Sequence, residues 1–281
     1  MRSDFAVMIC SHGRAETMTT YRMLRNQGFS GEIIIVIDDE DEQAERYKEL
    51  YDHVEVFCKE DYYKSSDGVI TGKQKAILYA RNACYDIAER LGLLYFTEFD
   101  DDLNSIFLRY IEEDRCLSYK PSNLDKTLDI VLDMLNVCDA VVGVSLLVQG
   151  DYIGGVASRA FRRAVRCCSQ AFFLRTDRRV DFLASMNEDT CSCLVHGMRG
   201  KLFFGVAGTM LEAEPIGQNT KMGNGMADFY KKMDSFARSF MATIVRPDCA
   251  GPELAGEDFR IRVSWENALP YIISERWKRY A

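Results

Sequence analysis

Three adjacent aspartates, Asp100 to Asp102, follow directly on the largely apolar run Leu93 to Phe99. Such a run is typical of a buried strand, and three neighbouring carboxylates repel one another unless water or a cation separates their charges. Carboxylate oxygens are the ligands that Mg²⁺ and Mn²⁺ prefer. The stretch therefore predicts a strand that ends at a metal site. The alternative is a solvated, acid-rich helix cap before Leu103.

Polar residues also follow the first two strands that the sequence predicts. Ser11-His12-Gly13-Arg14 comes after the apolar run 5–10, and Asp38-Asp39-Glu40-Asp41-Glu42 comes after the apolar run 32–37. Open α/β sheets bind ligands at the carboxyl ends of their strands, where an arginine can meet a phosphate and an acid can accept hydrogen bonds from a ribose or a base. The structural alternatives are a turn made by Gly13 and helix capping by the acids.

Strand and helix patterns alternate along the chain, which predicts an α/β fold. The first half contains strand patterns at 5–10, 32–37 and 53–58, the last with the alternation of an edge strand, and helix patterns at 15–27, 44–51 and 72–90. The second half contains helix patterns at 124–137, 188–198 and 226–244, strand patterns at 140–148, 170–175 and 201–206, and a glycine-rich loop at 217–225. No repeat or linker divides the chain, so we expect one domain over residues 1–281.

Length and composition indicate an ordinary globular protein. The 281 residues are 47% hydrophobic, and neither an apolar run long enough for a membrane span nor a signal-peptide pattern is present, so we expect a cytoplasmic protein without a membrane partner. The ten cysteines sit mostly within apolar runs, and we expect reduced thiols. Cys167-Cys168 and Cys191-x-Cys193 lack the paired spacing of a structural zinc site.

The charge distribution bears on possible partners. A formal net charge of −8 argues against nonspecific coating of nucleic acid, which needs a cationic surface. Positive charge is nevertheless concentrated in the middle of the chain, and a local basic groove there would bind DNA phosphates and lose affinity steeply as salt is added. The alternative is a solvated face. The predicted DNA-binding residues are Arg159, Arg162, Arg163, Arg175 and Arg178.

Three motifs together resemble the GT-A glycosyltransferases. They are the Asp-x-Asp of Asp100 and Asp102, the Ala80-Arg81-Asn82 that precedes it on a predicted helix, and the Glu188-Asp189 at the start of a later helix. The resemblance implies a Rossmann-like fold with a mostly parallel central sheet flanked by helices. It also implies a nucleotide-sugar-binding half at 1–110 and an acceptor-binding half, with the C-terminal helices, at 111–281.

The same resemblance implies roles for individual residues. Asp100 and Asp102 would hold Mn²⁺ or Mg²⁺ against the diphosphate of a nucleotide sugar, and Asp189, with Glu188 in reserve, would act as catalytic base in an inverting reaction. Asp38 or Asp39 would recognise uridine. The predicted nucleotide-sugar-binding residues are Ser11, Arg14, Asp38, Asp39, Lys73, Arg81, Asp100 and Asp101.

The chain departs from the GT-A pattern at its C-terminal end. Many of those enzymes recruit a late histidine as a metal ligand, but the histidines here are His12, His53 and His196. Water and phosphate, or one of the later carboxylates, would then complete the coordination of the ion. The candidate carboxylates are Asp228, Glu257 and Asp258.

Further stretches narrow the resemblance. The Ser-His-Gly-Arg loop, the Ile-Val-Ile-Asp-Asp-Glu-Asp-Glu block, Val-Phe-Cys-Lys and the stretch Trp265 to Lys278 look like the TET-associated glycosyltransferases, mostly phage-encoded enzymes that place sugars on 5-hydroxymethylcytosine in DNA. This implies a UDP-sugar donor, double-stranded DNA as partner, and the host cytoplasm as location.

Other functions fit parts of the pattern. A GT-A transferase could act on a protein, a lipid or a small molecule, which the acidic charge favours. A nucleotidyltransferase also uses paired aspartates, but it usually carries a glycine-rich, lysine-bearing loop after the first strand, which 11–14 matches poorly. A catalytically inactive GT-A module that binds nucleic acid is a third alternative, and the intact acidic motifs argue against it.

Overall fold

The computed structural model describes residues 1–65, 77–213 and 234–268. Several predicted features lie outside these residues: Lys73, the start of the 72–90 helix, the loop at 217–225, the 226–244 helix up to residue 233, and the end of the chain from 269. The candidate ligand Asp228 lies outside them as well.

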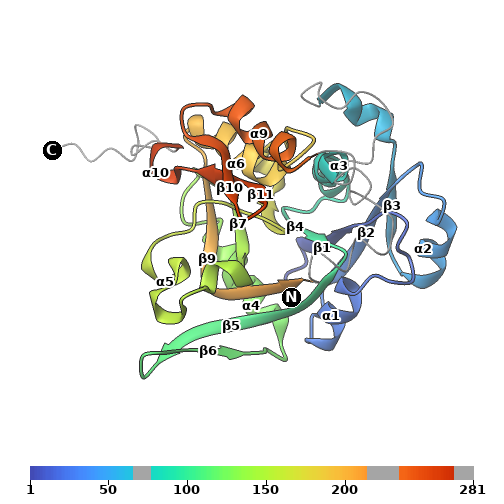
Figure 1. The fold of residues 1–281 in the computed structure, drawn as a ribbon. Coiled ribbons are helices and arrows are strands. Elements are labelled where there is room, and N and C mark those ends of the chain that lie inside the picture. Colours follow the sequence, from blue (N-terminus) through green and yellow to red (C-terminus); the bar gives the residue numbers. More distant parts are fainter. Residues whose placement is uncertain (66–76, 214–233, 269–281) are drawn as a thin grey trace.

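The described strands form a nine-stranded sheet in the order β3-β2-β1-β4-β8-β7-β9-β5-β6 (Figure 1). The sheet is mixed, because β5 and β8 run opposite to the other strands. The strands are β1 Phe5–Cys10, β2 Glu32–Asp38, β3 Val54–Phe57, β4 Tyr95–Asp100, β5 Leu103–Glu112, β6 Arg115–Tyr119, β7 Val141–Val148, β8 Ala171–Arg175 and β9 Leu202–Ala213.

Helices cover both faces of this sheet. In β1 the buried side chains alternate: Phe5, Val7 and Ile9 join the core under α1 and α4, whereas Ala6, Met8 and Cys10 join the core under α3. A central strand buried on both sides explains why 5–10 is apolar throughout. The helices are α1 Thr20–Asn26, α2 Ala44–Leu50, α3 Ile77–Arg90, α4 Leu124–Met134, α5 Arg159–Arg162, α6 Glu188–Met198, α9 Ser235–Val245 and α10 Trp265–Ala268.

Strand register brings the polar ends of three strands together. Cys10, the last residue of β1, lies beside Val36 of β2 and beside Asp100 of β4. The loop after β1, the acids after β2 and the aspartates after β4 therefore leave the same edge of the sheet. This is the edge at which the sequence places its candidate site.

The predicted α/β class is confirmed, and so are several elements. The strand at 54–57 is an edge strand, and the predicted helix 188–198 has the bounds of α6. The helix predicted at 15–27 begins only at Thr20, because the residues before it form a turn whose amides bind the Arg14 carbonyl. No helix in the described part of the chain is long and apolar enough to cross a membrane.

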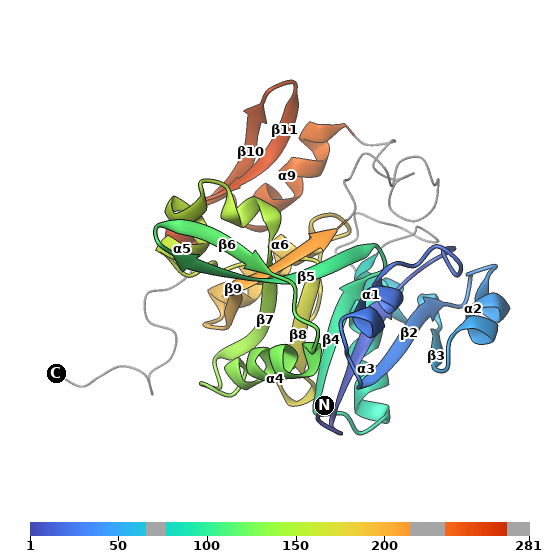
Figure 2. The same cartoon turned by 90° about the horizontal axis from the view of Figure 1, so that it is seen from below.

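Two hairpins were not predicted. The β5–β6 hairpin begins immediately after the aspartates and turns at Glu113 and Asp114, which have φ of 48° and 57°; positive φ at both central residues is the requirement of a tight hairpin turn. The second hairpin, β10 Ala250–Ala255 with β11 Asp258–Val263, forms a separate two-stranded sheet beside α9 (Figure 2).

Candidate active site

The turn that carries the three aspartates is fixed by the start of α1. The Thr20 hydroxyl donates to the Asp100 carbonyl (2.6 Å) and accepts from the Leu103 amide (2.9 Å), so it spans the turn. The amides of Thr19 and Thr20 donate to the Asp101 carbonyl at 3.1 and 3.3 Å. Thr20 is fully buried, so these bonds form in a low-dielectric environment where an unmade bond would be costly. The backbone of the aspartate turn is therefore rigidly placed.

The three aspartate side chains lie in different surroundings. Asp101 is buried and accepts from Arg14 Nη1 and from the Ser11 hydroxyl, both at 2.6 Å. The side chains of Asp100 and Asp102 remain 31% and 24% exposed. Asp101 was predicted to contact the nucleotide sugar, but both of its carboxylate oxygens bind the protein itself. The exposed oxygens of the turn belong to Asp100 and Asp102.

Arg81 of α3 connects the aspartate turn to the start of α6. Its buried guanidinium donates to Asp100 Oδ1 (3.2 Å), to Glu188 Oε1 (3.1 Å) and to Glu98 Oε2 (3.5 Å). The guanidinium also lies 5.0 Å from the centroid of the Phe172 ring, which suits a delocalised cation. One side chain thus holds a predicted metal ligand next to the predicted catalytic pair.

The charges around Arg81 are not balanced. Burial raises the pKa of Glu98 to about 8 and that of Asp100 to about 7, in spite of the nearby guanidinium. Glu98 Oε1 is buried without a hydrogen-bond partner in the described part of the protein. When all three carboxylates are ionised, their negative charge exceeds the positive charge of the single guanidinium by two. One divalent cation would balance this excess.

This donor set fits Mn²⁺ or Mg²⁺, because it offers carboxylate oxygens and an excess of negative charge. Asp100 and Asp102 would be the protein ligands. Among the described residues, no group of three or more His, Cys, Asp or Glu side chains is arranged to hold a metal. Oxygens from a bound phosphate or from water would therefore have to complete the coordination of the ion.

Glu188 and Asp189 occupy the first turn of α6, after Asn187 in the left-handed region with φ of 55°. The side-chain Nδ2 of Asn187 donates to the Arg238 carbonyl of α9 at 2.8 Å, which anchors this turn. Glu188 is buried against Arg81. Burial, followed by the charge of Glu188, raises the pKa of Asp189 to about 6, close to the value that suits a general base near neutral pH. Asp189 is the better candidate for proton transfer.

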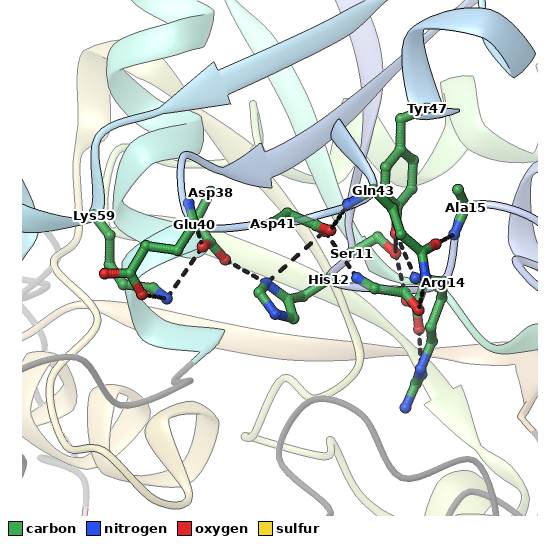
Figure 3. A network of polar contacts seen from close by, with 12 residues as sticks. Ser11, His12, Arg14, Ala15, Asp38, Glu40, Asp41, Gln43, Tyr47 and Lys59 are labelled. Carbon is green, nitrogen blue, oxygen red and sulfur yellow. Dashed lines mark hydrogen bonds and ion pairs between the residues drawn. The ribbon is translucent and has the colours of Figure 1, made fainter. Parts of the chain in front are cut away.

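The loop after β1 is held by side chains from the segment that follows β2 (Figure 3). The amide of Gly13 donates to Asp41 Oδ2 (2.8 Å), that of Arg14 to the Tyr47 hydroxyl (2.8 Å), and that of Ala15 to Gln43 Oε1 (2.9 Å). These amides are therefore committed to the fold. Arg14, which was predicted to meet a phosphate, binds Asp101 instead, so it orients the aspartate turn.

Asp38 and Asp39 differ in their surroundings. Asp38 pairs with His12 Nδ1 (2.7 Å) and with Lys59 Nζ (3.1 Å). Burial alone would raise the pKa of Asp38, but the hydrogen bond from His12 and the charge of Lys59 outweigh it and lower the pKa. Asp39 is exposed, and its Oδ1 accepts from the Lys59 amide (3.0 Å). His12 and Lys59 were not predicted as site residues.

The five arginines predicted to bind DNA lie in different elements of the fold. Arg159, Arg162 and Arg163 are exposed on or beside α5. Arg163 pairs with Glu266 at 2.9 Å, and Arg159 lies 3.6 Å from Asp151. These arginines form a surface group with only partial compensation by acids.

The other two predicted arginines bind groups of the protein itself. Arg175 lies opposite Tyr95, the first residue of β4, and therefore at the far end of that strand from Asp100; its guanidinium pairs with Asp177 (2.7 Å). Arg178 Nη1 donates to the carbonyls of Leu135, Cys138 and Val141 at 2.7 to 3.0 Å. It thereby secures the end of α4, where unpaired carbonyls need donors.

Comparison with known proteins identifies the family. Residues 5–222 match the model of a protein family described as TET-Associated Glycosyltransferase. The chain belongs to this family. The resemblance to this family inferred from the motifs is therefore confirmed. A search among curated proteins gives no match.

Solved structures with similar folds are distant from this TET-associated glycosyltransferase. TarS 1-349 from S. aureus has a TM-score of 0.44 at 13% identity, covering 73% of this chain and 59% of that one. The mannosyltransferase PcManGT from Pyrobaculum calidifontis, in complex with GDP-Man and Mn²⁺, has 0.46 at 14%, covering 77% and 58%. The glucosyl-3-phosphoglycerate synthase of M. tuberculosis has 0.45 at 10%, covering 89% and 84%. The chain thus spans less than two thirds of the length of the first two.

Proposed function

We propose that the protein is a metal-dependent glycosyltransferase that moves a sugar from a UDP-sugar to the hydroxyl group of 5-hydroxymethylcytosine in DNA. The observation that carries this proposal is the contact of a single buried guanidinium, that of Arg81, with both Asp100 and Glu188. A transferase must bring a donor and an acceptor together. Arg81 contacts both Asp100, a predicted ligand of the metal on the donor side, and Glu188, a member of the predicted catalytic pair on the acceptor side. The family membership gives the reaction class.

On the donor side, Asp100 and Asp102 would hold the metal ion against the diphosphate. A bound Mn²⁺ or Mg²⁺ supplies electrostatic stabilisation of the negative charge that develops on the leaving diphosphate. Arg81 keeps Asp100 in place, and Arg14 does the same for the turn through Asp101. Lys73, which lies outside the described residues, remains a candidate for a direct phosphate contact.

On the acceptor side, Asp189 would accept the proton of the hydroxymethyl group. The acceptor oxygen forms a bond to the anomeric carbon of the sugar while the bond from that carbon to the diphosphate oxygen breaks, and the electron pair leaves with the diphosphate. The proton ends on the Asp189 carboxylate. This assignment of a base corresponds to inversion at the anomeric carbon.

For the DNA itself, Arg159, Arg162 and Arg163 are the candidates for phosphate contacts, since they are exposed on an otherwise acidic chain. The hydroxymethyl group of a duplex lies in the major groove, so the enzyme must reach it there or extrude the nucleotide. Binding through a few arginines should weaken steeply as salt is added. Arg175 and Arg178 are not part of this proposed surface.

The decisive experiment incubates the protein with 5-hydroxymethylcytosine DNA, Mn²⁺ and a mixture of UDP-sugars, followed by mass spectrometry of the released nucleosides. A mass increase of one sugar on 5-hydroxymethyl-2′-deoxycytidine, absent with EDTA and with Asp102→Asn, supports the proposal. Parallel reactions with unmodified DNA and with hydroxylated small molecules test the alternative acceptors. If protein that binds UDP and Mn²⁺ transfers no sugar to the modified DNA, the DNA acceptor is wrong.

A further inference from the structure

The imidazole of His12 occupies a distinct position among the groups that follow β1 and β2. Its Nδ1 lies 2.7 Å from Asp38 Oδ2 and 3.8 Å from Asp41 Oδ2. The second ring nitrogen, Nε2, points away from both carboxylates (Figure 3), and among the described residues it has no protein partner. The ring is therefore held at Nδ1, whereas none of the described residues binds Nε2.

The chemistry of Asp38 decides which ring nitrogen carries the proton. The pKa of Asp38 is lowered, so this carboxylate is ionised at neutral pH and can only accept hydrogen bonds. Nδ1 must then be the donor. In the neutral ring, Nε2 consequently carries a lone pair and acts as a hydrogen-bond acceptor. Lys59 Nζ and the Glu40 amide bind the other oxygen of Asp38 at 3.1 Å each, so this carboxylate is held in place on both sides.

The position of His12 relative to the aspartate turn suits the base of a bound nucleotide. His12 follows β1 and Asp38 ends β2, at the edge where Asp100 ends the neighbouring strand β4. Two strand spacings, roughly 10 Å in all, separate β2 from β4. Open α/β sheets bind nucleotides along this edge, so a diphosphate held at Asp100 and Asp102 would place its nucleoside toward β2.

We propose that His12 Nε2 selects the nucleobase of the donor by accepting a hydrogen bond from a ring N–H group. Uracil and guanine carry such a group on the edge that would face the ring, whereas cytosine presents a lone pair there and would be rejected. Asp38 is then a positioning residue that fixes the tautomer of His12. It is not the group that contacts the base. This inference rests on the proposed use of a nucleotide-sugar donor at this site and adds the residue that reads its base.

The test measures base selectivity by isothermal titration calorimetry with UDP, GDP and CDP in the presence of Mn²⁺ at pH 8. The wild-type protein should bind UDP or GDP about tenfold or more tightly than CDP, because a mismatched pair of acceptors leaves a buried group unpaired. Whichever of UDP and GDP binds more tightly identifies the base.

Two variants separate selectivity from folding. His12→Asn retains a short amide that can donate to Asp38 but lacks the Nε2 position, so it should bind UDP and CDP with nearly equal affinity. Asp38→Asn can present its amide group to Nδ1, which moves the ring proton to Nε2 and turns this atom into a donor. The ratio of affinities should then shift toward CDP. A purely structural role of either residue would lower both affinities together and leave the ratio unchanged.

The control is His53→Asn, the same substitution in another histidine. His53 immediately precedes the edge strand β3 and pairs with Glu32 of β2 and Glu55 of β3. It should leave the UDP-to-CDP ratio at the wild-type value. An unchanged ratio in folded His12→Asn would overturn the inference. A wild-type protein that binds none of the three nucleotides would instead refute the proposed function. Selective UDP binding without sugar transfer to DNA would support the role of His12 and reject only the acceptor.

Discussion

Replacement of Arg81 by methionine tests the electrostatic reasoning behind the site. Methionine fills much of the same volume but leaves Glu98, Asp100 and Glu188 without their shared cation. Removing one partner of a buried ion pair typically costs about 3–5 kcal/mol, since the remaining charge stays buried and unpaired. We expect a loss of that size in the free energy of unfolding at pH 8 without divalent metal.

The sign of the pH dependence follows from the two raised pKa values. Glu98 titrates at about 8 in the folded protein and near 4.5 when unfolded, and Asp100 at about 7 against 3.8. Between these values the folded state retains protons that the unfolded state has released, so the free energy of unfolding falls as pH rises. For Glu98 alone the fall from pH 4 to pH 8 is about 4 kcal/mol. Arg81→Met removes the cation that opposes these shifts, so its destabilisation should be smaller at pH 5 than at pH 8.

Urea denaturation with EDTA, followed by circular dichroism at pH 5 and pH 8, measures both effects. The matched control is Arg90→Met on the same helix, where the arginine is 58% exposed and pairs with Glu55; an exposed pair contributes about 1 kcal/mol at most. If Arg81→Met costs no more than Arg90→Met, or costs the same at both pH values, the buried charge imbalance assigned to this cluster is wrong.

Three further outcomes are expected. Asp102→Asn should reduce sugar transfer by about a hundredfold or more while leaving the urea midpoint unchanged, because it removes an exposed metal ligand; retained transfer would mean that the metal lies elsewhere. The rate of sugar transfer should rise with pH through about 6, where Asp189 ionises. Asp189→Asn should lower this rate by roughly 10²–10⁴-fold. If the Asp189→Asn variant keeps the wild-type pH profile, Asp189 is not the base. Gly28→Ala should destabilise the fold by more than Gly92→Ala, although both glycines have positive φ (77° and 71°). Only the substitution at Gly28 would place a Cβ 2.3 Å from the Ser122 carbonyl oxygen. Equal losses of stability in urea denaturation would contradict the predicted clash.

The sequence was informative wherever an apolar run ended in polar residues. Strand periodicity located β1, β2 and β4, and the carboxyl ends of parallel strands necessarily share one edge of a sheet. That geometric rule alone predicts that the loop at 11–14, Asp38 and Asp100 lie close together. The motif at 188–189 was likewise located at the start of a helix whose bounds agree with those of α6.

Pairings between distant side chains could not be predicted in the same way. Glu98 lies between Thr97 and Phe99 in β4, and nothing in the local sequence indicates that it faces Arg81 of α3. Arg175 and Arg178 had the charge expected for DNA contacts, but strand register and the end of α4 commit them to the fold. Lys59 lies beyond the third strand, so its pairing with Asp38 depends on the order of strands in the sheet.

The aspartate triplet shows how the fold separates residues that the sequence presents as equivalent. Asp101 is neutralised by Arg14 and by a hydroxyl donor, and Asp100 shares Arg81 with two other acids. Asp102 Oδ2 lies 3.8 Å from Arg14 Nη1, and its side chain is 24% exposed. The partly exposed carboxylates of the turn are therefore those of Asp100 and Asp102, two residues apart. A divalent cation bound by this pair would also offset the charge excess around Glu98, which links catalysis and stability through the same ion.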